Sequence, residues 1–297
     1  TCSPEGSDRP VAGAVSTSRP SLLEPGRSYR HSAHLTGLQP ARRYTYTVTA
    51  PGSAPETGRF RTFPVAATAI TFIVIGDTHA RANIVKGLAA EFARHDPDFI
   101  LHTGDLVDDW SKPSQWRDGF FRAFGPLIRN VPLFPTRGNH DGAPELLPSF
   151  FDLPGDGRNY TFTFGNTQCF AVDERGPTPK RSLAACEKDL AASTALWRIA
   201  WFHHPIYNVA DHTYASKRDT YLPLFHRYGV DMTGCGHAHV YERFRPIAAA
   251  SPADPRPIIH VVSGGGGGDQ NRRGGLKPHP DLVQNYATHH YTVIRIA

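Results

Sequence analysis

Residues 70–108 read ITFIVIGDTHARANIVKGLAAEFARHDPDFILHTGDLVD. Two apolar runs in this stretch, TFIVIGD and DFILHTGD, each end at a Gly-Asp pair and are typical of short buried strands. Between them, residues 82–95 carry apolar side chains at the spacing of a helix. Strands that alternate with helices indicate an α/β fold, and ligands bind such folds at the carboxyl ends of the strands.

Five apolar runs of the chain, including these two, end in a short motif rich in polar side chains. Aspartate, asparagine and histidine recur in the motifs, and all three are hard or borderline metal ligands. Because the carboxyl ends of the strands form one rim, we expect the motifs to converge there and predict a two-metal hydrolase. The motifs are Gly76-Asp77-Thr78-His79, Gly104-Asp105-Leu106-Val107-Asp108, Gly138-Asn139-His140-Asp141, His203-His204-Pro205 and Gly236-His237-Ala238-His239.

The number and charge of the expected ligands suit two cations and an anionic substrate. A single zinc ion needs only three or four protein ligands, whereas the motifs supply seven. Two divalent cations with two aspartates and five neutral side chains keep an excess of roughly two positive charges, which favours a phosphate ester. Two ions about 3.5–4 Å apart could share one carboxylate and clamp an in-line displacement. The candidate ligands are Asp77, His79, Asp105, Asn139, His203, His237 and His239.

Each motif has a simpler interpretation when it is taken alone. A Gly-Asp or Gly-Asn pair after a strand is often a turn, and a His-His pair before proline can be an ordinary strand end. The fifth motif is the most specific, since histidines at i and i+2 beside a glycine are unusual in a plain loop. The occurrence of all five in order, each after an apolar run, favours the metal site.

Composition sets broader limits. The 297 residues suffice for one large domain or two modest ones, and 39% hydrophobic and 20% charged residues are ordinary for a globular protein. The net charge of +5 suits an anionic substrate, but the basic residues are scattered and predict no specific nucleic-acid binding. The longest apolar stretch is too short for a transmembrane segment. No signal peptide is visible at Thr1, so the chain is either cytoplasmic or numbered from a processed end.

The first part of the chain has a different pattern. Residues 1–30 are rich in Pro, Gly and Ser, and we expect them to be irregular. From residue 31, polar and apolar residues alternate between turn residues, which predicts short strands. The stretch HLTGLQPARRYTYTV, followed by FRTF, resembles the last strands of a fibronectin type III domain. We expect a partial β-sandwich over residues 1–65, marginal alone, and a catalytic domain over residues 66–297.

The catalytic domain is predicted to have an α/β (α+β) fold with two packed mixed β-sheets flanked by helices. Its further elements are helices at 183–192 and 219–228, a hairpin of Thr161–Phe164 and Cys169–Val172, and late strands at 258–262 and 290–296.

The order of the motifs, DxH, GDxxD, GNHD, H and GHxH, resembles the signature of the calcineurin-like metallophosphoesterases. The segments HAHVYER and VVSGGGGGD, at residues 237–243 and 261–269, are similar to the purple acid phosphatase branch, as is the fibronectin-like unit before them. The resemblance covers about residues 30–297.

The resemblance implies a role for each motif residue. His140 would face the substrate as general acid or transition-state stabiliser, and Asp108 would orient it. The cofactors would be two divalent or mixed-valence transition metal ions (Fe, Mn or Zn), with Asp105 as the bridging ligand. One ion would be held by Asp77, His79, Asp105 and His239, and the other by Asp105, Asn139, His203 and His237.

The chain departs from its relatives at three positions. The purple acid phosphatases have glycine in place of His79, and in place of Asp108 they have the tyrosine that binds ferric iron. A ferric-tyrosinate centre is therefore not expected here. Asp109 stands where Ser/Thr protein phosphatases have an arginine, which argues against a phosphoprotein phosphatase.

The leading interpretation is an acid phosphatase-like phosphomonoesterase in which a metal-activated water or hydroxide attacks a small phosphate ester. Further candidates for phosphate contacts are His204, Arg137 and Tyr207, although a sheet-end role for Arg137 is an equal alternative. A phosphodiesterase, including a cyclic-nucleotide type, is the first alternative. A non-catalytic surface-binding protein with a vestigial metal site is the second.

The resemblance also suggests a compartment. It favours a secreted or periplasmic location, with a cytoplasmic one left open, and export would allow a disulfide between Cys169 and Cys186. The sequence does not determine the oligomeric state.

Overall fold

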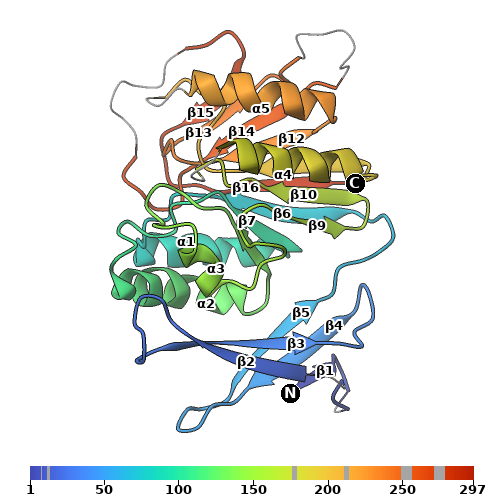
Figure 1. Ribbon diagram of the computed structural model, residues 1–297, viewed down its shortest axis with the longest axis vertical. Helices are drawn as coiled ribbons and strands as arrows, with labels where there is room; N and C mark the ends of the chain where they lie inside the picture. Colours follow the sequence, from blue (N-terminus) through green and yellow to red (C-terminus); the bar gives the residue numbers. More distant parts are fainter. Residues whose placement is uncertain (8, 12–13, 176–178, 211–213, 249–255, 271–277) are drawn as a thin grey trace.

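The computed structural model describes residues 1–7, 9–11, 14–175, 179–210, 214–248, 256–270 and 278–297. Two sheets form its centre (Figure 1). The smaller has the order β16 (Thr292–Ile296), β6 (Ile70–Ile75), β7 (Phe99–His102), β8 (Leu133–Pro135). The larger has the order β15 (Leu282–Tyr286), β13 (Tyr241–Phe244), β14 (Ile259–Ser263), β12 (Met232–Cys235), β11 (Trp197–Trp201), β10 (Thr167–Ala171), β9 (Tyr160–Phe164).

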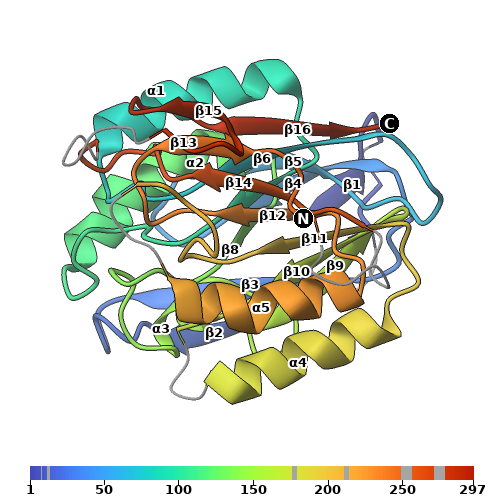
Figure 2. The same ribbon diagram turned by 90° about the horizontal axis from the view of Figure 1, so that it is seen from above.

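Helices cover the outer faces of both sheets, as predicted. In Figure 2, α4 and α5 lie side by side over the larger sheet, while α1 to α3 and a π-helical turn cover the smaller one. The bounds are α1 (Ala82–Phe92), a 3-10 turn (Ala93–His95), the π-helical turn (Gln115–Phe121), α2 (Arg122–Ile128), α3 (Leu146–Phe150), α4 (Pro179–Ala192) and α5 (Ala215–Arg227). No helix in these described ranges is long and apolar enough to cross a membrane.

Strand direction brings the polar motifs together. In the smaller sheet β6, β7 and β8 are parallel, and in the larger sheet β10, β11, β12 and β14 are parallel. The two sheets pack through an apolar layer that includes Phe72 and Val74 from one side and Ile199 and Trp201 from the other. The carboxyl ends of β6, β7, β8, β11 and β12 therefore carry all five motifs, one after each strand.

The N-terminal strands form two further small sheets at the lower end of Figure 1. One has the order β1 (Cys2–Pro4), β4 (Arg43–Val48), β5 (Glu56–Arg61), and the other pairs β2 (Ala14–Pro20) with β3 (Tyr29–Leu35). The expectation of an irregular segment over residues 1–30 was therefore wrong. Residues 16–20 are exposed, so β2 shows no alternation of buried and exposed side chains there. A domain boundary between residues 65 and 66 stays a prediction.

The cysteines also differ from one expectation. All four are buried free thiols, so the possible Cys169–Cys186 disulfide is not formed. Cys169 points into the layer between the two sheets, whereas Cys186 belongs to α4 and packs against the opposite face of the larger sheet. Successive residues of a strand face opposite sides. Cys169 consequently cannot reach a helix that packs on the face of its neighbour Phe170.

Candidate metal centre

Two clusters of donor atoms meet at the rim. In the first, Nε2 of His79 lies 3.1 Å from Nε2 of His239, and the latter lies 3.5 Å from Oδ1 of Asp77. Oδ2 of Asp105 completes this cluster at 3.7 Å from Nε2 of His79. The donors come from the loops after β6, β7 and β12.

The second cluster is centred on the fully buried His203. Its Nε2 lies 2.9 Å from Oδ1 of Asn139, 3.2 Å from Nδ1 of His237 and 3.3 Å from Oδ2 of Asp105. The same Asp105 oxygen therefore belongs to both clusters. The structure brings together all seven side chains that the motifs singled out.

The spacing of these atoms fits coordination of two cations. Two metal–ligand bonds of about 2.1 Å that meet at 90–109° place their donor atoms about 3.0–3.4 Å apart. The measured separations of 2.9 to 3.7 Å bracket that range. Unless cations or protons lie between them, this many lone pairs in a buried site would repel one another.

In three histidines Nδ1 contacts an oxygen acceptor outside the centre, and this contact directs Nε2 to the centre. Nδ1 of His203 donates to the Thr103 carbonyl at 2.8 Å, and Nδ1 of His239 donates to the Asp269 carbonyl at 2.6 Å. Nδ1 of His79 lies 3.3 Å from the Asp108 carboxylate. Such contacts fix the tautomer and ring orientation of metal-binding histidines.

Neighbouring charges shift the pKa values of several candidate ligands. Burial opposes ionisation of Asp105, but His203 and His79 outweigh burial and lower the pKa of Asp105. Burial would also lower the pKa of His203, yet Asp105 raises it to about 9, and Asp77 raises the pKa of His239 to about 9 against the same effect. Protons therefore compete with cations for these nitrogens.

His140 and Asp108 lie beside the first cluster, but their contact differs from the expectation. Nδ1 of His140 donates to the backbone carbonyl of Asp108 at 2.6 Å, while the Asp108 carboxylate faces His79. The backbone N–H of His140 donates to Oδ1 of Asp105 at 2.8 Å. The backbone carbonyl of Asp108 therefore orients the His140 imidazole, whereas the Asp108 carboxylate contacts His79.

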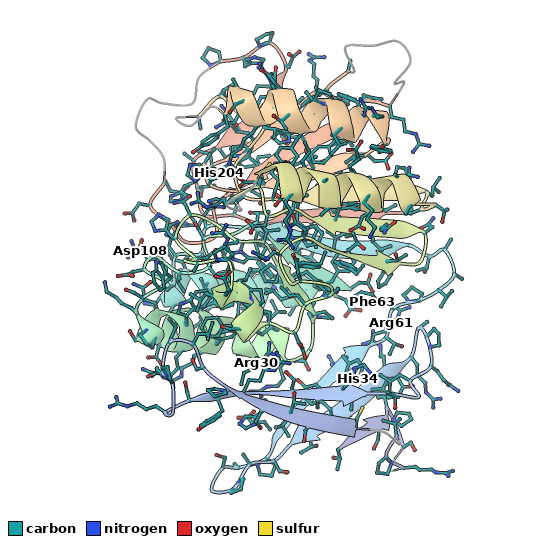
Figure 3. All side chains as sticks on the ribbon, viewed as in Figure 1. Arg30, His34, Arg61, Phe63, Asp108 and His204 are labelled. Atoms are coloured by element: carbon teal, nitrogen blue, oxygen red, sulfur yellow. The ribbon has the colours of Figure 1, made fainter. Side chains whose placement is uncertain are left out.

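The three further candidates for phosphate contacts are differently placed. Arg137 is buried and pairs with Asp173 at 3.1 Å, as in its alternative sheet-end role. Both ring nitrogens of His204 contact protein side chains. The Tyr207 hydroxyl lies 3.3 Å from Nε2 of His279 and donates to Asp281 at 3.3 Å. In Figure 3, Asp108 and His204 lie toward the same side of the molecule, away from the N-terminal strands.

Sequence reasoning missed two groups that shape the centre. The buried Asp141 carboxylate accepts the backbone N–H groups of Asp105, Leu106 and Gly138 at 2.7–2.8 Å, which ties the β7 loop to the β8 loop. The Tyr214 hydroxyl lies 2.7 Å from Nε2 of His237. Asp141 was visible as the last residue of the third motif, whereas no pattern marked Tyr214.

Comparisons with known proteins show the family and the fold. A family model described as calcineurin-like phosphoesterase matches residues 70–241. An uncharacterized protein of Mycobacterium tuberculosis is 27% identical, over 84% of this chain and 60% of that protein. Purple acid phosphatase 21 of Arabidopsis thaliana is 26% identical, over 82% of this chain and 59% of that protein. A solved purple acid phosphatase from yellow lupin seeds has a TM-score of 0.77 at 19% identity, covering 99% of this chain and 64% of that one.

The chain therefore belongs to the calcineurin-like phosphoesterase family, as its motifs predicted. The lupin structure bears out the predicted fold of two packed mixed sheets flanked by helices. The chain spans 60% and 59% of the length of the two curated relatives.

Proposed function

We propose that the protein is a dinuclear metal-dependent phosphomonoesterase of the acid phosphatase type. The observation that carries the proposal is the Asp105 carboxylate, whose one oxygen lies within 3.7 Å of a histidine in each donor cluster. The bound cations would supply positive charge to the phosphoryl oxygens and a low pKa for an attacking water. Asp77, His79, Asp105 and His239 would hold one ion, and Asp105, Asn139, His203 and His237 the other.

His140 would assist the leaving group. The Asp108 carbonyl accepts the Nδ1 proton at 2.6 Å, which leaves Nε2 to hold a proton and pass it to the leaving oxygen. A half-buried position beside His79 gives the imidazole access to a substrate. The choice of Fe, Mn or Zn, and a location outside the cytoplasm, are proposals that rest on the likeness to purple acid phosphatases.

A substrate panel tests this function. We expect p-nitrophenyl phosphate to be hydrolysed faster than bis-p-nitrophenyl phosphate after loading with Mn, Fe or Zn. Faster hydrolysis of the diester would contradict the phosphomonoesterase and support the alternative function, a phosphodiesterase. Absence of turnover with all three metals and both esters would favour a non-catalytic protein with a vestigial site.

A further inference from the structure

Arg175 lies shortly after β10, and its positive charge has no counter-ion among the site residues introduced above. Among the residues that the structure describes, no carboxylate forms an ion pair with its guanidinium, and its buried Nε has no hydrogen-bond partner. Its one side-chain hydrogen bond in the described ranges joins NH1 to Nε2 of His204, 3.4 Å away.

His204 is arranged to hold this guanidinium. Arginine can only donate hydrogen bonds, so Nε2 of His204 must present its lone pair and Nδ1 must carry the proton. Nδ1 lies 2.8 Å from Oε1 of Glu174, which accepts a hydrogen bond from it and another from the backbone N–H of His204 at 2.9 Å. Nζ of Lys217 lies 2.7 Å from the same Nδ1, so Lys217 packs against both members of this pair. Glu174, His204 and Arg175 therefore form a chain of hydrogen bonds.

The chain does not neutralise Arg175. Burial opposes ionisation of Glu174, but hydrogen bonds from His204 and Lys217 outweigh it and lower the pKa of Glu174 to about 2. Lys217 contacts the other oxygen of this carboxylate. The negative charge of Glu174 is thus matched by Lys217, and the guanidinium keeps an excess positive charge.

The position of Arg175 relative to the metal centre limits what it can bind. The ring of His204 packs against the rings of His237 and His203, with centroids 4.4 and 5.0 Å apart. Arg175 contacts Nε2 of the same imidazole, so His204 links its guanidinium to the second donor cluster. The guanidinium is not one of the groups that converge on the shared Asp105 oxygen, so it is placed to bind a part of the substrate other than the reacting phosphoryl group.

We propose that Arg175 is a specificity-determining residue that binds a second anionic group, a carboxylate or a phosphate, on the alcohol part of the phosphate ester. The inference rests on the proposed function, since it places the reacting phosphoryl group at the two clusters. A guanidinium recognises both anions with paired, charge-assisted hydrogen bonds. The preferred substrates are therefore small phosphomonoesters that carry another negative charge.

Binding of non-hydrolysable analogues tests the inference independently of turnover. In calorimetry on metal-loaded protein, phosphonoacetate should bind about tenfold or more tightly than methylphosphonate, since charge-assisted hydrogen bonds account for the difference. Arg175→Gln should abolish this preference without weakening methylphosphonate. Arg181→Gln, on the exposed side of α4, is the matched control and should keep the preference. Equal binding of both analogues by the unaltered protein would overturn the proposal.

Turnover measurements distinguish a carboxylate from a phosphate as the second anionic group. They also distinguish failure of the Arg175 proposal from failure of the proposed phosphomonoesterase function. Phenyl phosphate against 4-carboxyphenyl phosphate tests the carboxylate, and glucose 6-phosphate against glucose 1,6-bisphosphate tests the phosphate. For the substrate of each pair that carries the second anionic group, Arg175→Gln should raise KM about tenfold and leave kcat nearly unchanged. An equal loss with every substrate, or loss of bound metal, would show a structural role and refute the inference. Analogue discrimination without any turnover would instead reject the phosphomonoesterase and leave the anion site standing.

Discussion

Four residues of the candidate centre have left-handed backbone angles, with φ of 58° at Asp77, 46° at His79, 54° at Asp105 and 66° at His237. Such angles cost a non-glycine residue roughly 1–2 kcal/mol and cluster at functional sites, where the surrounding structure enforces them. The purple acid phosphatase pattern has glycine in place of His79. A glycine would have revealed this turn in the sequence, whereas the histidine hides it.

The shared carboxylate of Asp105 gives the first residue-scale expectation. Asp105→Asn removes one negative charge from both donor clusters, so both cations should bind more weakly together. His239→Ala should affect the first cluster alone, since this histidine has no donor contact in the second. Elemental analysis of metal-replete protein measures this, with Asp109→Asn as the control from the same loop. Loss of a single ion from Asp105→Asn would contradict the bridging role.

His140 should act on the leaving group without holding a cation. His140→Ala should keep the metal content of the unaltered protein and reduce kcat about 10²–10⁴-fold for alkyl phosphates. The loss should be smaller for p-nitrophenyl phosphate, because p-nitrophenolate needs little protonation. Asp108→Asn keeps the backbone carbonyl that orients His140 and should therefore disturb kcat less. An equal kcat loss for leaving groups of high and low pKa would refute the general-acid role.

At the scale of elements, prediction succeeded where one face of an element is buried. The helix over residues 82–95 and the hairpin around Gly165 and Asn166 both occur where the pattern put them. The helix expected at 219–228 begins earlier, at Ala215, since the polar first turn of α5 shows no apolar stripe. The turn and helix over residues 115–128 were not predicted, because Gly119, Gly125 and Pro126 interrupt an otherwise helical pattern.

Asp141 joins two of these loops, and its removal should be costly. In Asp141→Ala, three backbone N–H groups of the β7 and β8 loops lose their acceptor. Each unsatisfied buried donor costs about 1–3 kcal/mol, so the free energy of unfolding should fall by about 3 kcal/mol or more. Urea unfolding of metal-free protein measures this, with the exposed Asp219→Ala as control. A change below 1 kcal/mol, on the order of one net hydrogen bond, would mean that other groups hold the loops.

Glu242 on β13 should make stability depend on pH. Burial raises its pKa from 4.5 to about 7 in the folded protein. Between pH 4.5 and 7 the unfolded chain loses this proton first, so the free energy of unfolding should fall as pH rises, by up to about 3 kcal/mol. Above pH 7 this contribution should be constant. Urea titrations of metal-free Glu242→Gln should show a shallower pH dependence, and an unchanged slope would assign the effect elsewhere.

At the scale of the molecule, the motifs predicted the sandwich and the gathering of seven donor side chains, because strand direction alone sends five strand ends to one rim. Side chains without a motif could not be predicted in the same way. Tyr214, Glu174 and Arg175 reach the centre from segments that are remote in sequence from their partners. Their roles depend on how the loops fold back over the larger sheet, which periodicity does not encode.

The connection between the N-terminal strands and the sandwich gives the last expectation. The half-buried Phe63, just after β5, packs against the rings of Phe99, Phe134, Phe162 and Phe164, with centroids 5.0–6.1 Å apart. It therefore contributes to the apolar layer between the two sheets although it precedes the proposed boundary.

Phe63→Ala should lower the free energy of unfolding of the sandwich by about 2–3 kcal/mol, somewhat less than for a fully buried phenylalanine. The neighbouring Val65→Ala should change nothing, since Val65 is 79% exposed. Urea unfolding of chains that begin at residue 62 and at residue 66 separates Phe63 from the strands before it. The longer chain should be more stable by the amount that Phe63→Ala removes. Equal stability of the two chains would place the boundary at residue 65 and show that the sandwich is complete without Phe63.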